Sequence, residues 1–305
     1  MTTTTSSPLR RIYNWLNRNL RPNTTFTYAQ PSDPLPRAAA INFLEHLMGI
    51  SRLRGMYNRL ERVAKTKPLN PWNTFIDEFR FKLRFDERQL AKIPKDGPVI
   101  FIGNHVYGLL DGGVLAHLAY RTRGQLKLFI NSAFALCRDP YFGKDIYPII
   151  FDETKDAARE NIEISKQALA YLREGGTIAI FPSGATATAP NVFDKAREGE
   201  WKLFTAKMIQ QSKATVVPVF FHGQNSWRFH LANKVNRYIR YAMVVGEAIR
   251  RMDTEVHVEI GDPIPYEKIA HIKGRRKLLN HLRKVVYRLG GEEYTPQDNT
   301  QTPIN

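Results

Sequence analysis

From residue 97 onward, short apolar runs alternate with longer amphipathic segments, and this alternation limits how the chain can fold more than any other feature. The apolar runs predict strands at residues 99–103, 126–131, 145–151, 177–181, 215–222 and 256–261. The amphipathic segments predict helices at residues 109–122, 155–174, 200–211, 227–235 and 275–288. Such alternation is typical of an α/β fold, so we predict a mixed sheet flanked by helices, with an N-terminal helical extension.

Composition and periodicity divide the 305-residue chain into four parts. We predict a flexible basic N-terminal segment at residues 1–37, a helical region at 38–90, the α/β domain at 91–291 and a polar tail at 292–305. The helical region has helical apolar spacing at residues 38–65 and predicts a further short helix at 72–83. In the first part, residues 10–21 form a basic amphipathic pattern, which indicates either a segment in a lipid interface or a surface helix.

The charge of the chain points to anionic partners. It has 45 Lys and Arg and 29 Asp and Glu side chains, so the net charge is 45 − 29 = +16. Anionic lipid headgroups, an acidic carrier protein and nucleic acid would all complement that charge. No nucleic-acid-binding motif accompanies it, so we predict an anionic membrane surface and no nucleic acid.

Several features bear on the compartment. The single cysteine, Cys137, excludes an internal disulfide and is typical of a reducing environment. Residues 1–7 lack the pattern of a signal peptide, and no stretch reaches the ~18–20 apolar residues of a spanning helix. We therefore predict a cytoplasmic protein that lies peripherally on the inner face of a membrane. No metal-type Cys/His cluster is apparent, and we predict no metal.

The stretch from Gly103 to Gly113 carries the candidate chemistry. A buried parallel strand is predicted to end at His105, and Asp111 follows six positions later. On one continuous helix these side chains would lie roughly 120° apart, so the pair needs a bend, which Gly108 can supply. We predict His105 in a loop as a general base and Asp111 near a helix start as its orienting carboxylate. Taken alone, a core histidine and a helix-capping aspartate would be the more common interpretation.

Further motifs follow in a fixed order and resemble a known family. The stretch from Asn104-His105 through Asp111 resembles the first motif of the glycerolipid (lysophospholipid) acyltransferase superfamily. With the later blocks, the resemblance covers residues 85–289. Five residues separate His105 from Asp111, which looks like the bacterial hemolysin-like branch that includes acyltransferases of ornithine-type aminolipids. The later blocks are Phe181-Pro182-Ser183-Gly184, Val216-Val217-Pro218-Val219, Phe221-His222-Gly223-Gln224-Asn225-Ser226 and Gly261-Asp262-Pro263-Ile264.

The resemblance implies a glycerolipid-acyltransferase-like fold and direct acyl transfer. The donor would be a thioester of acyl carrier protein or of coenzyme A. The acceptor would be a lyso-glycerolipid or a lyso-aminolipid. No other cofactor is expected. His105 would take the acceptor proton and Asp111 would hold the imidazole. The implied substrate-binding residues are Asn104, Gly108, Phe181, Pro182, Ser183 and Gly184.

Two departures from the superfamily pattern bear on the acceptor. Ser183 stands where the motif usually has Glu, and residues 148–155 lack the Arg thought to hold an acceptor phosphate. Lys144, Lys155 or Arg159 could take the place of that Arg. A lost phosphate clamp favours an aminolipid or another lyso-lipid over lysophosphatidate. Asn225 follows a predicted strand, where it either contacts substrate or caps the next helix, and capping is slightly favoured.

Other classes of function stay open at this point. The changed residues in the second and third blocks would also suit a non-catalytic lipid- or membrane-binding protein on the same fold. Nucleic-acid binding rests on net charge alone and is the weakest of the three.

Overall fold

The structure is a computed structural model that describes residues 49–64, 70–132, 140–151, 154–235 and 237–292, with isolated positions before residue 49. The predictions for residues 10–21, for Cys137 and for the tail beyond residue 292 lie outside the described residues. The chain divides into two compact units, residues 1–68 and 69–305. In the first unit the structure describes helix α3 (Ile50–Ala64), which falls within the predicted helical region.

The second unit is built around a mixed sheet, which confirms the predicted fold class. Its described strands are ordered β1-β7-β6-β2-β5-β3-β4. Their bounds are β1 (Lys82–Arg84), β2 (Val99–Gly103), β3 (Lys127–Asn131), β4 (Ile146–Ile149), β5 (Thr177–Ile180), β6 (Thr215–Phe221) and β7 (Glu255–Ile260). Strand β2 pairs in parallel with both β5 and β6, so Phe101 lies between Ala179 and Val217. Strand β7 joins β6 antiparallel.

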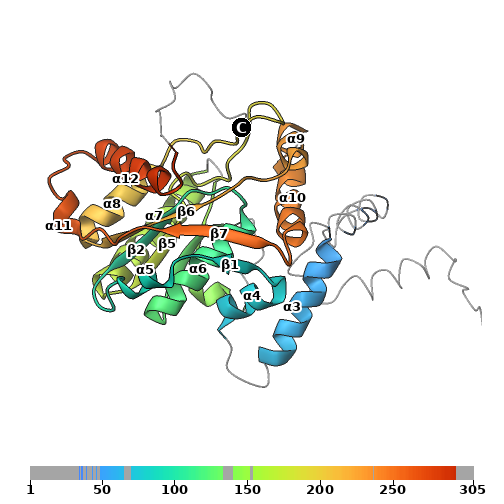
Figure 1. The fold of residues 1–305 in the computed structure, drawn as a ribbon, viewed down its shortest axis with the longest axis horizontal. Helices are drawn as coiled ribbons and strands as arrows, with labels where there is room; N and C mark the ends of the chain where they lie inside the picture. The colour runs from blue at the N-terminus through green and yellow to red at the C-terminus, as the bar shows by residue number, and fades with distance from the viewer. Residues whose placement is uncertain are drawn as a thin grey trace, which may run out of the picture. The chain divides into compact units, whose positions relative to one another are not determined.

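Helices cover both faces of this sheet (Figure 1). On one face lie α7 (Lys155–Arg173), α8 (Leu203–Ser212) and α12 (Arg275–Leu289); on the other lie α4 (Pro71–Phe79), α5 (Glu87–Ala91) and α6 (Leu109–Arg123). Helices α9 (Trp227–Val235) and α10 (Arg237–Arg250) pack on each other, and α10 also contacts α6. The remaining short elements are η2 (Gly143–Asp145) and α11 (Tyr266–Ile269).

The central strand β2 is buried on both faces, as its continuous apolar run predicts. Successive side chains point to opposite faces, so Ile100 and Ile102 pack in the cluster with α7, α8 and α12. Val99 and Phe101 point the other way, and all four side chains are fully buried. Each such side chain contributes about 1.5–3 kcal/mol through burial, which makes β2 a rigid base for the loop that follows it.

The helix predicted at residues 72–83 is wrong in its second half. Helix α4 ends at Phe79, and Arg80 takes a left-handed conformation with φ of 52° as its C-cap. After that turn, residues 82–84 pair with β7 as strand β1 instead of continuing the helix. Sheet pairing with a strand more than 170 residues later is not visible in local periodicity, which explains the error.

Two helices also differ from the predictions. Helix α8 begins at Leu203 and not at residue 200, because Trp201 is buried and Lys202 donates its backbone N–H to the Pro182 carbonyl at 2.8 Å. Helix α10 was not predicted at all. Its Val244, Val245 and Ala248 are buried, but arginines and a glutamate interleave with them.

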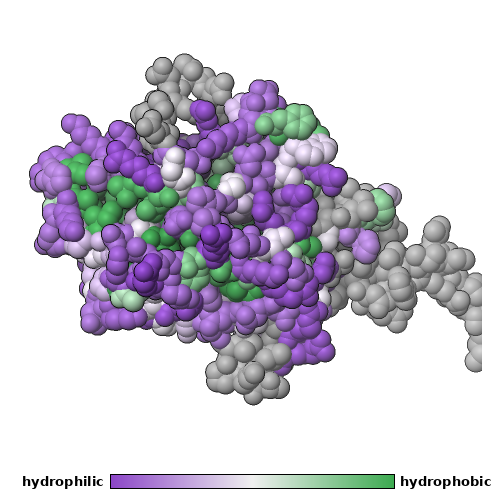
Figure 2. All heavy atoms as spheres, in the orientation of Figure 1, coloured by the Kyte–Doolittle hydropathy of each residue, from purple (hydrophilic) through white to green (hydrophobic). Residues whose placement is uncertain are grey.

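The surface is mainly polar on the face drawn in Figure 2, where hydrophilic residues cover most of the described area and hydrophobic residues show between them. Among the described residues, none of the helices combines the length and the hydropathy that a bilayer crossing requires.

The contact between α4 and α6 generates a test of the packing. An ideal Cβ placed on Gly113 would lie 2.0 Å from Cε1 of Phe75, a buried ring. Gly113→Ala should therefore lower the free energy of unfolding by about 1–3 kcal/mol, measured by urea denaturation.

The matched control is the neighbouring Gly112, where an added Cβ meets nothing within 4 Å. Gly112→Ala should raise the free energy of unfolding by up to about 1 kcal/mol, since alanine is the better helix former. Equal effects of the two substitutions would contradict the packing described here.

Candidate functional site

The candidate site lies where three adjacent parallel strands end. Strands β6, β2 and β5 are neighbours in the sheet, and their carboxyl ends share one edge. The segments that follow them begin at His222, Asn104 and Phe181, so three motifs that are far apart in sequence meet there. Sites in α/β sheets usually lie at this edge.

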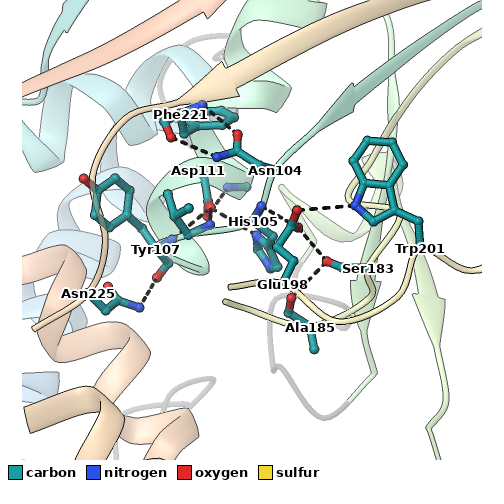
Figure 3. A network of polar contacts seen from close by, with 12 residues as sticks. Asn104, His105, Tyr107, Asp111, Ser183, Ala185, Glu198, Trp201, Phe221 and Asn225 are labelled. Atoms are coloured by element: carbon teal, nitrogen blue, oxygen red, sulfur yellow. Dashed lines mark hydrogen bonds and ion pairs between the residues drawn. The ribbon is translucent and has the colours of Figure 1, made fainter. Parts of the chain in front are cut away.

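His105 and Asp111 are in direct contact, with 3.1 Å between His105 Nδ1 and Asp111 Oδ2 (Figure 3). The bend at Gly108 is present: its φ is 88°, and it stands immediately before the first residue of α6. Gly108 is also crowded, because an added Cβ would lie 2.7 Å from a methyl carbon of Val244. His105 therefore stays in the loop while Asp111 sits in the first turn of the helix.

The Asp111 carboxylate organises the whole loop. It is fully buried, and besides His105 its Oδ2 accepts the backbone N–H groups of Val106 at 2.7 Å and Tyr107 at 3.0 Å. Its Oδ1 accepts the N–H of Gly112 at 3.2 Å. Because the carboxylate accepts at Nδ1, that nitrogen carries the proton in neutral His105, and Nε2 keeps a free lone pair.

The rest of His105 is held just as firmly. Its backbone N–H donates to Oε1 of Glu198 at 2.8 Å, and its carbonyl accepts the N–H of Ala187 at 2.6 Å. Its ring stacks on Phe181, with 4.1 Å between centroids and 18° between the planes. His105 is thus held by contacts to its main chain, to the Nδ1 edge of its ring and to one face of its ring, so the imidazole has one orientation.

Electrostatics favour a basic His105. Burial lowers the pKa of His105, but the charge of Asp111, the hydrogen bond to Asp111 and the charge of Glu198 together raise that pKa above its usual value. A raised pKa makes the neutral imidazole a stronger proton acceptor.

Sequence reasoning missed Glu198. The residue stands in a charged run, Lys195-Ala196-Arg197-Glu198-Gly199-Glu200, which usually indicates a solvated loop. In the structure its carboxylate is buried and also accepts hydrogen bonds from Ser183, Trp201 and Tyr287. No local pattern distinguishes it from the exposed Glu200 two positions later.

The predicted polar residues have specific partners. Asn104 exchanges two hydrogen bonds with the Phe221 backbone, at 2.9 and 2.7 Å, and so continues the β2–β6 ladder with its side chain. Ser183 is buried, with its hydroxyl oxygen 2.8 Å from Glu198 Oε1 and 3.0 Å from the Ala185 carbonyl oxygen. Asn225 is buried, and its amide N–H donates to the Tyr107 carbonyl at 3.5 Å.

Ser226, which precedes α9, donates its hydroxyl to the buried carboxylate of Glu247 on α10. The backbone N–H of Ser226 donates to the same side chain at 3.1 Å. Ser226 therefore ties the start of α9 to α10.

Two of the cations predicted to bind a phosphate, Lys155 and Arg159, lie on the exposed surface of α7. Lys155 is the first residue of α7, and Arg159 lies one turn later; both are exposed. Arg159 lies 3.8 Å from Asp156 as a surface ion pair. Neither residue lines the cavity described next.

A largely apolar cavity of about 400 Å³ reaches His105. Its wall includes five predicted site residues, namely His105, Gly108, Phe181, Pro182 and Gly184. Its apolar lining comes from Trp72, Phe75, Leu109, Leu128, Phe129, Ile130, Phe142, Ile149, Phe151, Ile180, Phe204 and Val244. Two basic residues, Lys202 and Arg240, also belong to the described lining. Such a cavity suits an aliphatic chain with its polar end near His105.

One group of described side chains has metal-binding chemistry: His222 on the loop after β6, and His257 and Glu259 on β7. Oε1 of Glu259 lies 2.9 Å from Nε2 of His257, and the rings of His222 and His257 stack with 4.2 Å between their centroids. None of the three side chains lines the cavity beside His105.

Known proteins are similar to this chain in sequence. A family model described as acyltransferase matches residues 84–222. The chain is 26% identical over 241 residues to a lyso-glycine lipid O-acyltransferase of Bacteroides thetaiotaomicron, covering 71% of this chain and 84% of that protein. It is 22% identical over 259 residues to a lyso-glycine lipid O-acyltransferase of Phocaeicola vulgatus, covering 82% and 87%.

Among solved structures, the chain aligns with the crystal structure of the 1-acyl-sn-glycerophosphate (LPA) acyltransferase PlsC from Thermotoga maritima. The TM-score is 0.48 and the identity 16%, over 93% of this chain and 94% of that chain.

The contact between His105 and Asp111 predicts a measurable shift. Asp111→Asn removes a negative charge that raises the His105 pKa, so the His105 pKa should fall. Titration of the His105 ring protons by NMR, assigned with His105→Gln, measures the change. Asp262→Asn, which removes an exposed carboxylate paired with Lys92, serves as the control and should leave that pKa unchanged. An equal His105 pKa in wild type and Asp111→Asn would contradict the electrostatic coupling.

Proposed function

This chain carries an acyltransferase domain and belongs to the glycerolipid acyltransferase superfamily, and from that premise we propose that it acylates the hydroxyl of a lyso-aminolipid. The acyl donor is a thioester of acyl carrier protein or coenzyme A. The observation that carries the proposal is the position of His105, which is held by Asp111 in the wall of a largely apolar cavity.

His105 is the general base in the proposed mechanism. Asp111 occupies Nδ1, so Nε2 is the nitrogen that takes the proton from the acceptor hydroxyl. The acceptor oxygen then attacks the thioester carbonyl carbon, and the carbon–sulfur bond breaks as the new ester forms. The thiolate leaves with the proton that His105 has taken. Asp111 stabilises the imidazolium in the interval, since the two groups carry opposite charge.

The cavity holds the fatty acyl chain in this proposal. Its aromatic and aliphatic walls come from both sides of the sheet edge, from α4, α6, α8 and the strands β3 and β4. Burial of a chain there would contribute roughly 0.8 kcal/mol for each methylene removed from water. That contribution would hold the acyl chain in a cavity whose wall includes His105.

The proposed acceptor has an anionic headgroup that Lys202 and Arg240 could bind. The two relatives act on lyso-glycine lipid by their names, and such a lipid carries a carboxylate. Lys202 and Arg240 line the cavity and offer cations to an anionic headgroup. Lys155 and Arg159 stay as predicted alternatives, but Lys202 and Arg240 have the stronger support because they line the cavity and Lys155 and Arg159 do not.

The proposal places the enzyme on an anionic membrane surface, where its lipid substrates reside. The support is the net charge of +16, which complements anionic headgroups. A non-catalytic lipid-binding protein on the same fold is the alternative, and turnover by the purified protein separates the two.

His105→Ala tests the central role. With a lyso-glycine lipid acceptor and an acyl thioester donor, product formed by the purified wild type is measured by mass spectrometry. His105→Ala should lower kcat/KM on the order of 10²- to 10⁴-fold, the usual contribution of a positioned base. His271→Ala changes an exposed histidine and should keep wild-type turnover. Retained turnover in folded His105→Ala would sink the proposed mechanism.

Ser165→Leu tests the acyl cavity. Ser165 lies on α7 and lines the cavity. The added volume should shift the preference toward shorter acyl donors, with kcat/KM for the longest donors reduced about 10-fold or more. Ser165→Ala is the matched control and should keep the wild-type chain-length profile. A uniform loss across all chain lengths would contradict the assignment of the cavity to the acyl chain.

A further inference from the structure

Glu198 is a buried carboxylate that lies in the loop between β5 and α8, outside every described helix and strand. Its Oε1 accepts hydrogen bonds from the backbone N–H of His105 and the hydroxyl of Ser183, both at 2.8 Å (Figure 3). Its Oε2 accepts the Tyr287 hydroxyl at 2.8 Å and the Trp201 indole N–H at 3.3 Å. Burial of a carboxylate is strongly unfavourable without such donors, so the site is built to hold this group.

The donors come from parts of the chain that must be aligned for catalysis. His105 follows β2, Ser183 follows β5, and Tyr287 lies on α12. Through Oε1, Glu198 therefore connects the loop after β2 with the loop after β5, and residues of both loops line the cavity. Through Oε2, Glu198 connects these loops to α12. The same junction is reinforced by Lys202, whose backbone N–H donates to the carbonyl of Pro182 at 2.8 Å.

Glu198 also acts on the charge of the base. Among the described residues, the charged groups that face His105 are Asp111 from α6 and Glu198 from the loop before α8. Both raise the His105 pKa, Asp111 by charge and a hydrogen bond, and Glu198 by charge. Asp111 contacts the ring of His105, whereas Glu198 accepts a hydrogen bond from the main chain of His105.

We propose that Glu198 is a positioning residue for acyl transfer, and that its carboxylate fills the place that a longer acidic side chain at position 183 would occupy. The idea rests on the proposed function, because it takes His105 as the base. Ser183 points at the carboxylate of Glu198 at hydrogen-bond distance, so a glutamate there, two carbons longer, would bring its own carboxylate to the same point. In this chain the Ser183 hydroxyl and the Glu198 carboxylate, fifteen positions later, thus share the place that one longer acidic side chain at position 183 would fill.

The test compares Glu198→Gln with wild type in turnover and in the His105 pKa. The amide keeps the size of the side chain but removes the charge. We expect kcat/KM to fall on the order of 10- to 100-fold, since small misplacements of a reacting group cost about that much. The acid limb of the pH profile should move to lower pH, because His105 loses a charge that raises its pKa.

Glu200→Gln is the matched control, because Glu200 is two positions away, is exposed and pairs with Arg276 on the surface. It should keep wild-type turnover and an unchanged pH profile. A purely structural Glu198 would lower the yield or Tm of Glu198→Gln but leave kcat/KM of the folded enzyme and its acid limb unchanged, and that result would overturn the proposal.

The double variant Ser183→Glu/Glu198→Ala, compared with Glu198→Ala alone, tests the shared place directly, because alanine clears the space that a glutamate at position 183 would need. It should recover at least about 10-fold of the lost kcat/KM and return the acid limb toward wild type. A folded double variant with no recovery would overturn the claim that the two positions share one role. The comparison also keeps the proposal testable if Glu198→Gln alone does not fold.

The His105 pKa measured by NMR separates this proposal from the proposed function. That readout needs no turnover, so it remains informative if the wild type transfers no acyl group and the proposed function fails. A lower His105 pKa in Glu198→Gln supports the electrostatic part of the proposal, and an equal pKa overturns it.

Discussion

The carboxylate of Asp111 is the interaction on which the rest of the site depends. It is fully buried and accepts from His105 Nδ1 and from the backbone N–H groups of Val106, Tyr107 and Gly112. Hydrogen bonds to a charged group contribute about 1.5–3 kcal/mol each, so the loop after β2 has little freedom to take another shape. One side chain therefore sets both the path of the main chain and the tautomer of His105.

The parallel sheet makes that arrangement possible. Strands β6, β2 and β5 end at one edge, and the Asn104 amide continues the β2–β6 ladder beyond the last strand residue. The loop is thus fixed to β6 by backbone-like hydrogen bonds before it turns at Gly108. On the other side, Glu198 joins the same loop to the segment after β5. His105 is held between two carboxylates, of which one contacts its ring and the other its main chain.

The cavity and the polar network meet at His105, and this division suits a reaction between a long apolar chain and a polar acceptor. Apolar side chains from α4, α6, α8 and the strands line the space, while the carboxylates of Asp111 and Glu198 contact His105 and are not part of the described lining. Asp111 and Glu198 are both buried, and their hydrogen-bond donors offset the cost of removing these carboxylates from water.

The sequence by itself determined the α/β class, the central strand and the bend at Gly108 that allows His105 to meet Asp111. These follow from local rules: an apolar run buried on both faces, and a glycine that alone tolerates the φ of 88°. Tertiary structure decided the rest. Strand β1 exists because it pairs with β7, Lys155 and Arg159 lie outside the cavity lining, and Glu198 is buried although it sits in a charged run. Long-range contacts place these residues, because the hydrogen-bond donors to Glu198 come from the segments after β2 and β5 and from α12, which no local pattern brings together.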